Sequence, residues 1–112
     1  MTKECQHKEL ASGKWFQMSF FQQMANIGSE IERTINWKEK NIEYSKKALE
    51  RAFELLHLTI SDKKNIKRLK ELLRLKELLL DYFYSDNEYF STDEFFKNYF
   101  YCFAYAVRVN KL

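Results

Sequence analysis

The sequence contains no proline and only two glycines in 112 residues. These two residue types supply the fixed and the positive φ angles that tight turns, hairpins and bulges usually require. An all-β or α/β chain normally needs more of both, whereas helices joined by short polar connections do not. The scarcity of turn residues therefore predicts an all-α fold, and 112 residues suffice for one domain with its own core.

Apolar residues recur at spacings of three and four in four segments, which is the pattern of amphipathic helices. These segments cover residues 19–39, 43–60, 62–84 and 92–109. Residues 1–14 are polar and lack this periodicity, so we expect them to form an N-terminal arm. The sequence thus predicts a compact four-helix bundle made by a single domain, residues 15–112.

Polar residues mark where these helices begin. Ser19 and Gln22 have the spacing of a capping box, and Asn41 interrupts the apolar pattern where we expect a turn. Asp62 offers an N-cap oxygen to the third helix. Ser91 precedes the last helix at the spacing that lets it cap a backbone amide three residues later.

Several classes of protein are disfavoured by composition. No run of 18 or more apolar residues predicts a membrane span, and the N-terminus lacks the pattern of a secretory signal, so we expect a cytoplasmic protein without a membrane partner. Cys5 and Cys102 are too few and too far apart to predict a disulfide framework or a zinc site. Phosphate-binding glycine loops and nucleophile elbows do not occur. We therefore predict no cofactor or metal and favour a noncatalytic protein.

The last predicted helix carries aromatic residues on nearly every side. One side can fill the bundle core, but a helix that is apolar around most of its circumference favours burial against a second chain as well. Tyrosine and phenylalanine are also enriched in protein interfaces. The sequence thus predicts a homo-oligomer, with an interface formed by Phe95, Tyr99, Tyr101 and Tyr105.

Charged residues three positions apart predict polar pairs on the helices. Such pairs lie on one helix face and contribute only ~0.2–0.5 kcal/mol when exposed. Some lie beside core positions, so a polar cluster shared between helices is a second interpretation. Its members would be Glu30, Arg33, Glu54 and Glu77.

Arg51 and His57 are separated by five residues on the second predicted helix. This spacing resembles the Arg-x4–6-His motif of HEPN-domain proteins, which are small helical bundles that often dimerise and in many cases cleave RNA without metal. The resemblance implies that Arg51 would hold the phosphate and that His57 would act as general base or acid. Ala52 stands where the family commonly has a polar residue. A HEPN-like ribonuclease is therefore the main alternative to a noncatalytic protein.

Glu54 and His57 have the Glu-x-x-His spacing by which di-iron bundles present a carboxylate and an imidazole to metal. Such a site needs two of these motifs, and this chain has one. A metal-binding bundle is a further alternative.

Basic residues are concentrated at the start of the third predicted helix. Lys63, Lys67, Lys70 and Arg74 advance by three or four residues, so they share one face and can follow a phosphate backbone. An ordinary solvated face is the competing interpretation. In size and polarity the chain is similar to small bacterial four-helix proteins, including the family encoded in intervening sequences of 23S rRNA genes. We therefore expect a self-associating interaction protein with an RNA or protein partner.

Overall fold

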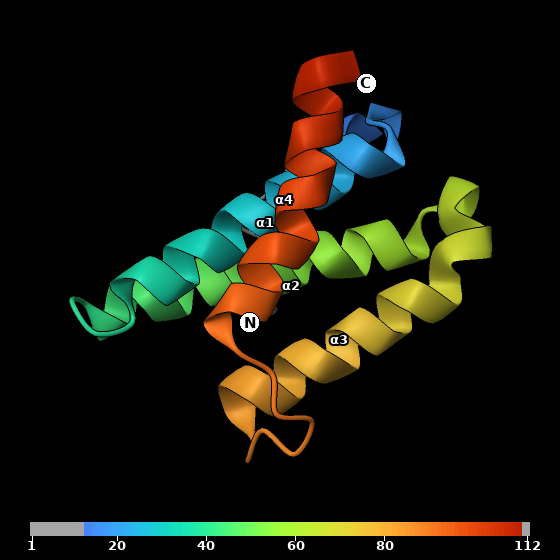
Figure 1. The fold of residues 1–112 in the computed structure, drawn as a ribbon. Helices are drawn as coiled ribbons and strands as arrows, with labels where there is room; N and C mark the ends of the chain where they lie inside the picture. Colours follow the sequence, from blue (N-terminus) through green and yellow to red (C-terminus); the bar gives the residue numbers. More distant parts are fainter. Residues whose placement is uncertain (1–12, 111–112) are drawn as a thin grey trace, which may run out of the picture.

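A computed structural model describes residues 13–110 of the chain (Figure 1). Helices are the only regular elements in this range, so the predicted all-α fold with four helices is confirmed. Residues 1–12 of the predicted arm lie outside the described residues. The elements are η2 (Trp15–Gln17), α1 (Phe20–Trp37), α2 (Ile42–Ser61), η3 (Lys63–Arg68), α3 (Leu69–Tyr84) and α4 (Asp93–Asn110), where η denotes a 3-10 helix.

Short polar side chains begin the helices by accepting backbone amides that lack a helical partner. Ser19 and Gln22 form the predicted capping box at α1. Asn41 ends the turn after α1 and caps α2 by accepting from the amide of Tyr44. At α4 the prediction named the wrong residue, because Thr92 Oγ1 accepts from the amide of Phe95 at 3.0 Å.

The predicted third helix is divided into η3 and α3 by Asn65. This residue has φ −97° and ψ 15°, which is outside the helical region. Its side-chain amide donates to the carbonyl of Thr59 and to the side chain of Gln23. These bonds turn the chain sharply after α2, so η3 lies beside the end of α2 and α3 returns along it (Figure 1).

Helix α1 packs extensively against both α2 and α4. The backbone of α3 comes close to the other elements at fewer positions, chiefly along α2 and η3. Figure 1 shows α4 crossing in front of α1. The core fills the space between these helices with side chains from all four and from η2. Its largest fully buried members are Trp15, Met24, Ile27, Ile31, Leu56, Leu72, Leu79 and Phe96.

The crossing of α1 and α4 depends on Gly28. A Cβ atom at this position would lie 2.6 Å from the Cβ of Phe100, which is shorter than van der Waals contact allows. Glycine therefore lets the two helix backbones approach each other, and this explains a residue that costs about 1 kcal/mol relative to alanine in a helix.

Within residues 13–110, none of the helices combines the length and the apolar character needed to cross a bilayer.

Candidate functional site

Both faces of helix α4 carry aromatic residues, but one face is buried and the other is exposed. Phe96 and Phe100 are buried in the core, and Phe103 packs its ring against Phe20 and Phe21 of α1. Exposed residues occupy the opposite side at alternating spacings of three and four. We call this set the outer seam of α4; it consists of Phe95, Asn98, Cys102, Tyr105 and Val109.

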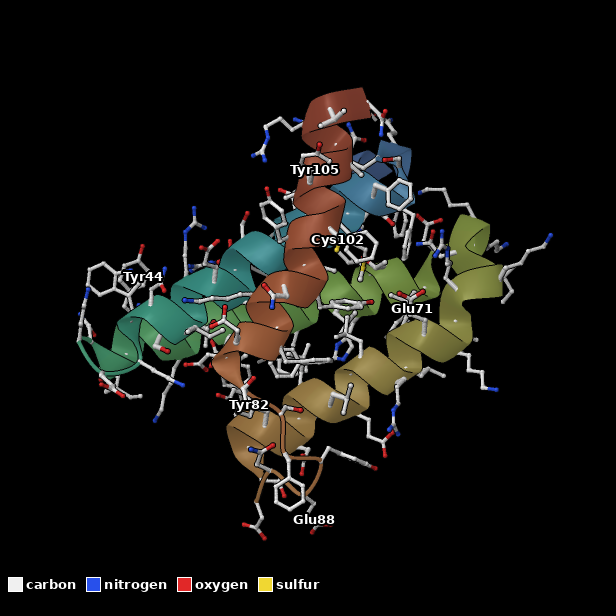
Figure 2. The ribbon with its side chains drawn as sticks, viewed as in Figure 1. Tyr44, Glu71, Tyr82, Glu88, Cys102 and Tyr105 are labelled. Carbon is white, nitrogen blue, oxygen red and sulfur yellow. The ribbon has the colours of Figure 1, made fainter. Side chains whose placement is uncertain are left out.

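The outer seam exposes several large apolar side chains. Phe95 is 45% exposed, Tyr105 51% and Val109 54%. Tyr101 lies beside the seam, is 56% exposed, and has its ring 6.1 Å from that of Tyr105. Figure 2 shows Tyr105 towards the C-terminal end of α4 and Cys102 nearer the middle. Three of the four residues predicted for an interface therefore lie together on the surface.

Tyr99, the fourth predicted interface residue, faces the interior between α3 and α4. Its hydroxyl donates to Glu71 Oε2 at 2.7 Å. Burial of the ring, together with this hydrogen bond and the negative charge of Glu71, raises the pKa of the Tyr99 hydroxyl well above its ordinary value. Tyr99 therefore holds α4 against α3 within one chain.

Two hollows flank α4, and both are small. One of about 210 Å³ lies between α1 and α4 beside Gly28, Ser29 and Tyr101. The other, of about 110 Å³, lies between α3 and α4 beneath Phe95 and Tyr99. Sites for small molecules usually enclose about 300–1,000 Å³. These hollows fit side chains from a docking partner better than a metabolite.

The predicted polar cluster is present in part. Glu30 is nearly buried, and its two carboxylate oxygens accept from Arg33 Nη1 at 3.0 Å and from Arg51 Nε at 3.3 Å. Arg51 belongs to α2, so this cluster joins α1 to α2. A nearly buried carboxylate must be paired in this way, because burying an unpaired charge is far more costly.

Glu77 lies away from this cluster, on α3. Its carboxylate accepts from Arg74 Nη1 at 3.4 Å and from the Tyr89 hydroxyl at 2.8 Å. The fourth residue predicted for the polar cluster, Glu54, is half-buried on α2.

Arg51 and His57 have different neighbours although they share α2. Arg51 is bound to Glu30 of α1, whereas His57 is exposed and lies near the ring of Phe53 and the charge of Lys76 on α3. Burial on one side and the positive charge of Lys76 lower the pKa of His57. This environment favours the neutral form of the His57 imidazole. The guanidinium of Arg51, which a phosphate would need as a partner, is already paired with Glu30.

The Glu-x-x-His spacing on α2 is not accompanied by further ligands. In the part of the chain that the structure describes, no group of three or more histidine, cysteine, aspartate or glutamate side chains is arranged to hold a metal ion. The metal-binding alternative therefore gains no support from these residues.

The predicted basic residues lie along η3 and the start of α3. Lys63, Lys67 and Lys70 are exposed, and no ion pair within residues 13–110 involves them. Arg74 differs, because it pairs with Glu77 and lies 4.8 Å over the Tyr89 ring. These three exposed lysines follow one another along η3 and the first turn of α3, and we call them the η3 lysine surface.

Sequence analysis missed a buried polar network where η2, α1, α2 and η3 meet. We call it the junction network; its side chains belong to Trp15, Gln23, Thr59, Asp62 and Asn65. Gln23 is fully buried and donates to the carbonyl of Trp15 and to Asp62 Oδ2 at 2.9 Å. It accepts from Asn65 at 2.9 Å, while Trp15 Nε1 donates to Thr59 Oγ1 at 3.1 Å. The signal was a glutamine on the apolar stripe of α1, one turn before Ile27.

Asp62 is the charged member of the junction network. Burial alone would raise the pKa of its carboxyl, but hydrogen bonds from the side chains of Lys64 and Gln23 and from the amide of Lys64 outweigh burial and lower that pKa. Lys64 also donates to the carbonyl of Phe16 at 3.1 Å. Because its groups satisfy one another, this network fixes the fold at this end of the molecule and offers no open site.

No protein-family model, curated protein sequence or solved structure matches the chain.

Proposed function

We propose that this protein is a noncatalytic helical-bundle interaction protein that self-associates through the outer seam of α4. The observation that carries the proposal is the exposed row of Phe95, Tyr105 and Val109, with Tyr101 beside it. Apolar surface gathered in one row is stabilised by contact with another protein surface, whereas scattered apolar residues need no such explanation.

The noncatalytic reading is supported by the state of the polar groups. Arg51 is held by Glu30 and His57 lies near Phe53, so the two side chains have different partners, which favours a structural role for Arg51. The buried junction network is closed by its own hydrogen bonds, and the hollows beside α4 are small. These features favour packing over chemistry as the task of the molecule.

Self-association is tested by measuring native mass as a function of concentration for two matched variants. Tyr105→Glu places a charge in the outer seam, and Tyr44→Glu places one at an exposed tyrosine of α2. Burying an unpaired carboxylate is costly, so the first variant should stay monomeric at concentrations where the wild type and the second variant form dimers. Equal masses for the two variants would contradict the proposed surface.

The η3 lysine surface supports RNA as a partner. Three exposed lysines that form no ion pair within residues 13–110 can each replace a counterion on a phosphate backbone. Binding of an RNA oligonucleotide should then weaken steeply with salt, and Lys67→Gln with Lys70→Gln should reduce that slope by about two. Lys46→Gln with Lys47→Gln on α2 is the matched control, because those lysines are also exposed. Absent or salt-insensitive binding would rule out this partner.

A further inference from the structure

The spacing of the outer seam defines how a second copy packs against it. Phe95, Asn98, Cys102, Tyr105 and Val109 follow one another at intervals of three, four, three and four residues. This alternation is the a and d pattern of a coiled coil, in which two helices cross at about 20° with their side chains interdigitated. Because α4 is already held by its own bundle, it need not fold upon pairing.

We infer that two copies pair their α4 helices antiparallel, with Cys102 of each copy near the two-fold axis. This inference rests on the proposed self-association and adds its orientation and register. In an antiparallel pair the a positions of one helix lie against the d positions of the other, so Phe95 faces the partner's Tyr105 and aromatic side chains meet at both ends. Asn98 faces the partner's Cys102, and the two-fold axis passes between the two contacts of this kind.

Charge decides between antiparallel and parallel pairing. Glu94, Tyr101 and Arg108 recur at intervals of seven residues along one edge of the seam. In an antiparallel pair these edges face each other, so Glu94 lies beside the partner's Arg108, and symmetry repeats the contact. A parallel pair instead places Glu94 opposite the partner's Tyr99 and gains no opposite charges.

Both charged residues are available for this contact. Glu94 and Arg108 are exposed, and neither forms an ion pair within residues 13–110. The guanidinium of Arg108 lies 5.9 Å from the centre of the Tyr105 ring, so it is already directed along the seam. The oppositely directed helix dipoles of an antiparallel pair add to the preference for this orientation.

The size of the contact sets its strength. Four turns of one helix bury less than the ~1,600 Å² of a standard interface, and contacts of this kind are weak. Dimers should therefore form at high micromolar concentration and dissociate on dilution.

Charge reversal tests the orientation. Glu94→Arg and Arg108→Glu each place like charges together in the antiparallel pair, so each should weaken the dimer about tenfold. The double variant E94R/R108E restores opposite charges and should recover the affinity of the wild type. Both reversals oppose the α4 dipole, so recovery in the double variant cannot come from helix stability. Circular dichroism of each variant confirms that α4 is folded.

Oxidative cross-linking tests the register. In a Cys5→Ser background that also carries Asn98→Cys, mild oxidation at dimer-forming concentration should link residue 98 to the partner's Cys102, because residues of one layer come within disulfide range. Lys97→Cys in place of Asn98→Cys is the matched control, since Lys97 is exposed on α4 away from the seam. It should cross-link far less.

The outcomes separate this inference from the proposed function. A dimer that is insensitive to both charge reversals, or that cross-links equally through residues 97 and 98, would overturn the antiparallel register while leaving self-association intact. A chain that stays monomeric at every concentration would overturn both.

Discussion

The junction network and the outer seam of α4 place side chains in opposite environments. Polar groups are buried in the junction network, and apolar groups are exposed in the outer seam. In the junction network, Gln23, Asp62 and Asn65 are buried polar groups that satisfy one another within a single chain. On the outer seam, Phe95, Tyr105 and Val109 are apolar side chains that the described chain leaves about half exposed. The first region completes the fold, whereas the second leaves surface for a partner.

This difference separates residues that stabilise the monomer from residues that promote association. A substitution in the junction network should change the free energy of unfolding at any protein concentration. A substitution in the outer seam should change the dissociation constant of the dimer and leave the isolated chain almost as stable as before.

Gln23→Leu should lower the free energy of unfolding by about 2–4 kcal/mol, because it removes the buried hydrogen bonds that Gln23 makes with Asp62, Asn65 and the carbonyl of Trp15. Gln17→Leu provides the matched control, since Gln17 is exposed and its change should stay within about 0.5 kcal/mol. Chemical denaturation at low protein concentration measures both. Equal losses would mean that the junction network does not stabilise the fold.

Gly28→Ala should lower the free energy of unfolding by about 1–2 kcal/mol. The added methyl group would overlap Phe100, and the cost of forcing α1 and α4 apart exceeds the helix propensity that alanine gains. Ser29→Ala, at the exposed neighbouring position, should have little effect. Thermal unfolding of both variants checks this, and an unchanged or higher midpoint for Gly28→Ala would contradict the close crossing.

Tyr105→Ala should change the free energy of unfolding of the monomer by no more than about 0.5 kcal/mol, because half of its surface is already exposed. The same variant should raise the dissociation constant of the dimer about tenfold, since interface tyrosines contribute strongly to binding. Denaturation at low concentration and sedimentation at high concentration give the two values. A large loss in monomer stability would show that Tyr105 belongs to the core.

His57 should produce the smallest effect, a dependence of stability on pH. Burial and the charge of Lys76 lower its pKa in the folded chain below 6.5, so folding favours the neutral imidazole. Its contribution is therefore complete above pH 6.5 and is lost as pH falls through the lowered pKa. His57 is exposed, so solvent screening keeps this contribution small.

Stability measured between pH 7.5 and 5.5 should accordingly fall less in His57→Gln than in the wild type. Lys76→Gln should give an intermediate slope, because it removes the nearby charge and leaves the burial. A steeper slope in His57→Gln would reverse the sign of the argument.

The helices were predictable because their signals are local. The spacing of apolar residues and the caps at Ser19 and Asn41 place α1 and α2 within about two residues of the observed ends. The break at Asn65 was not predictable in this way, since it depends on hydrogen bonds to Gln23, which is 42 residues away in the sequence. The same holds for Arg51, whose partner Glu30 lies on another helix.

The exposed residues of α4 were predictable only in part. Its aromatic content indicated more apolar surface than one core needs, but periodicity alone does not tell which face is inside. Tyr99 was assigned to the interface for this reason, and its place between α3 and α4 follows from Glu71, which accepts its hydroxyl. Cys102 and Val109 could be assigned to the outer seam only after the structure showed which face of α4 is buried.

Sedimentation equilibrium of the unmodified chain over a wide concentration range tests the central claim most directly. The outer seam predicts a mass that rises from one chain at low micromolar concentration towards two chains at several hundred micromolar, with no larger species. A mass of one chain throughout that range would contradict self-association through α4.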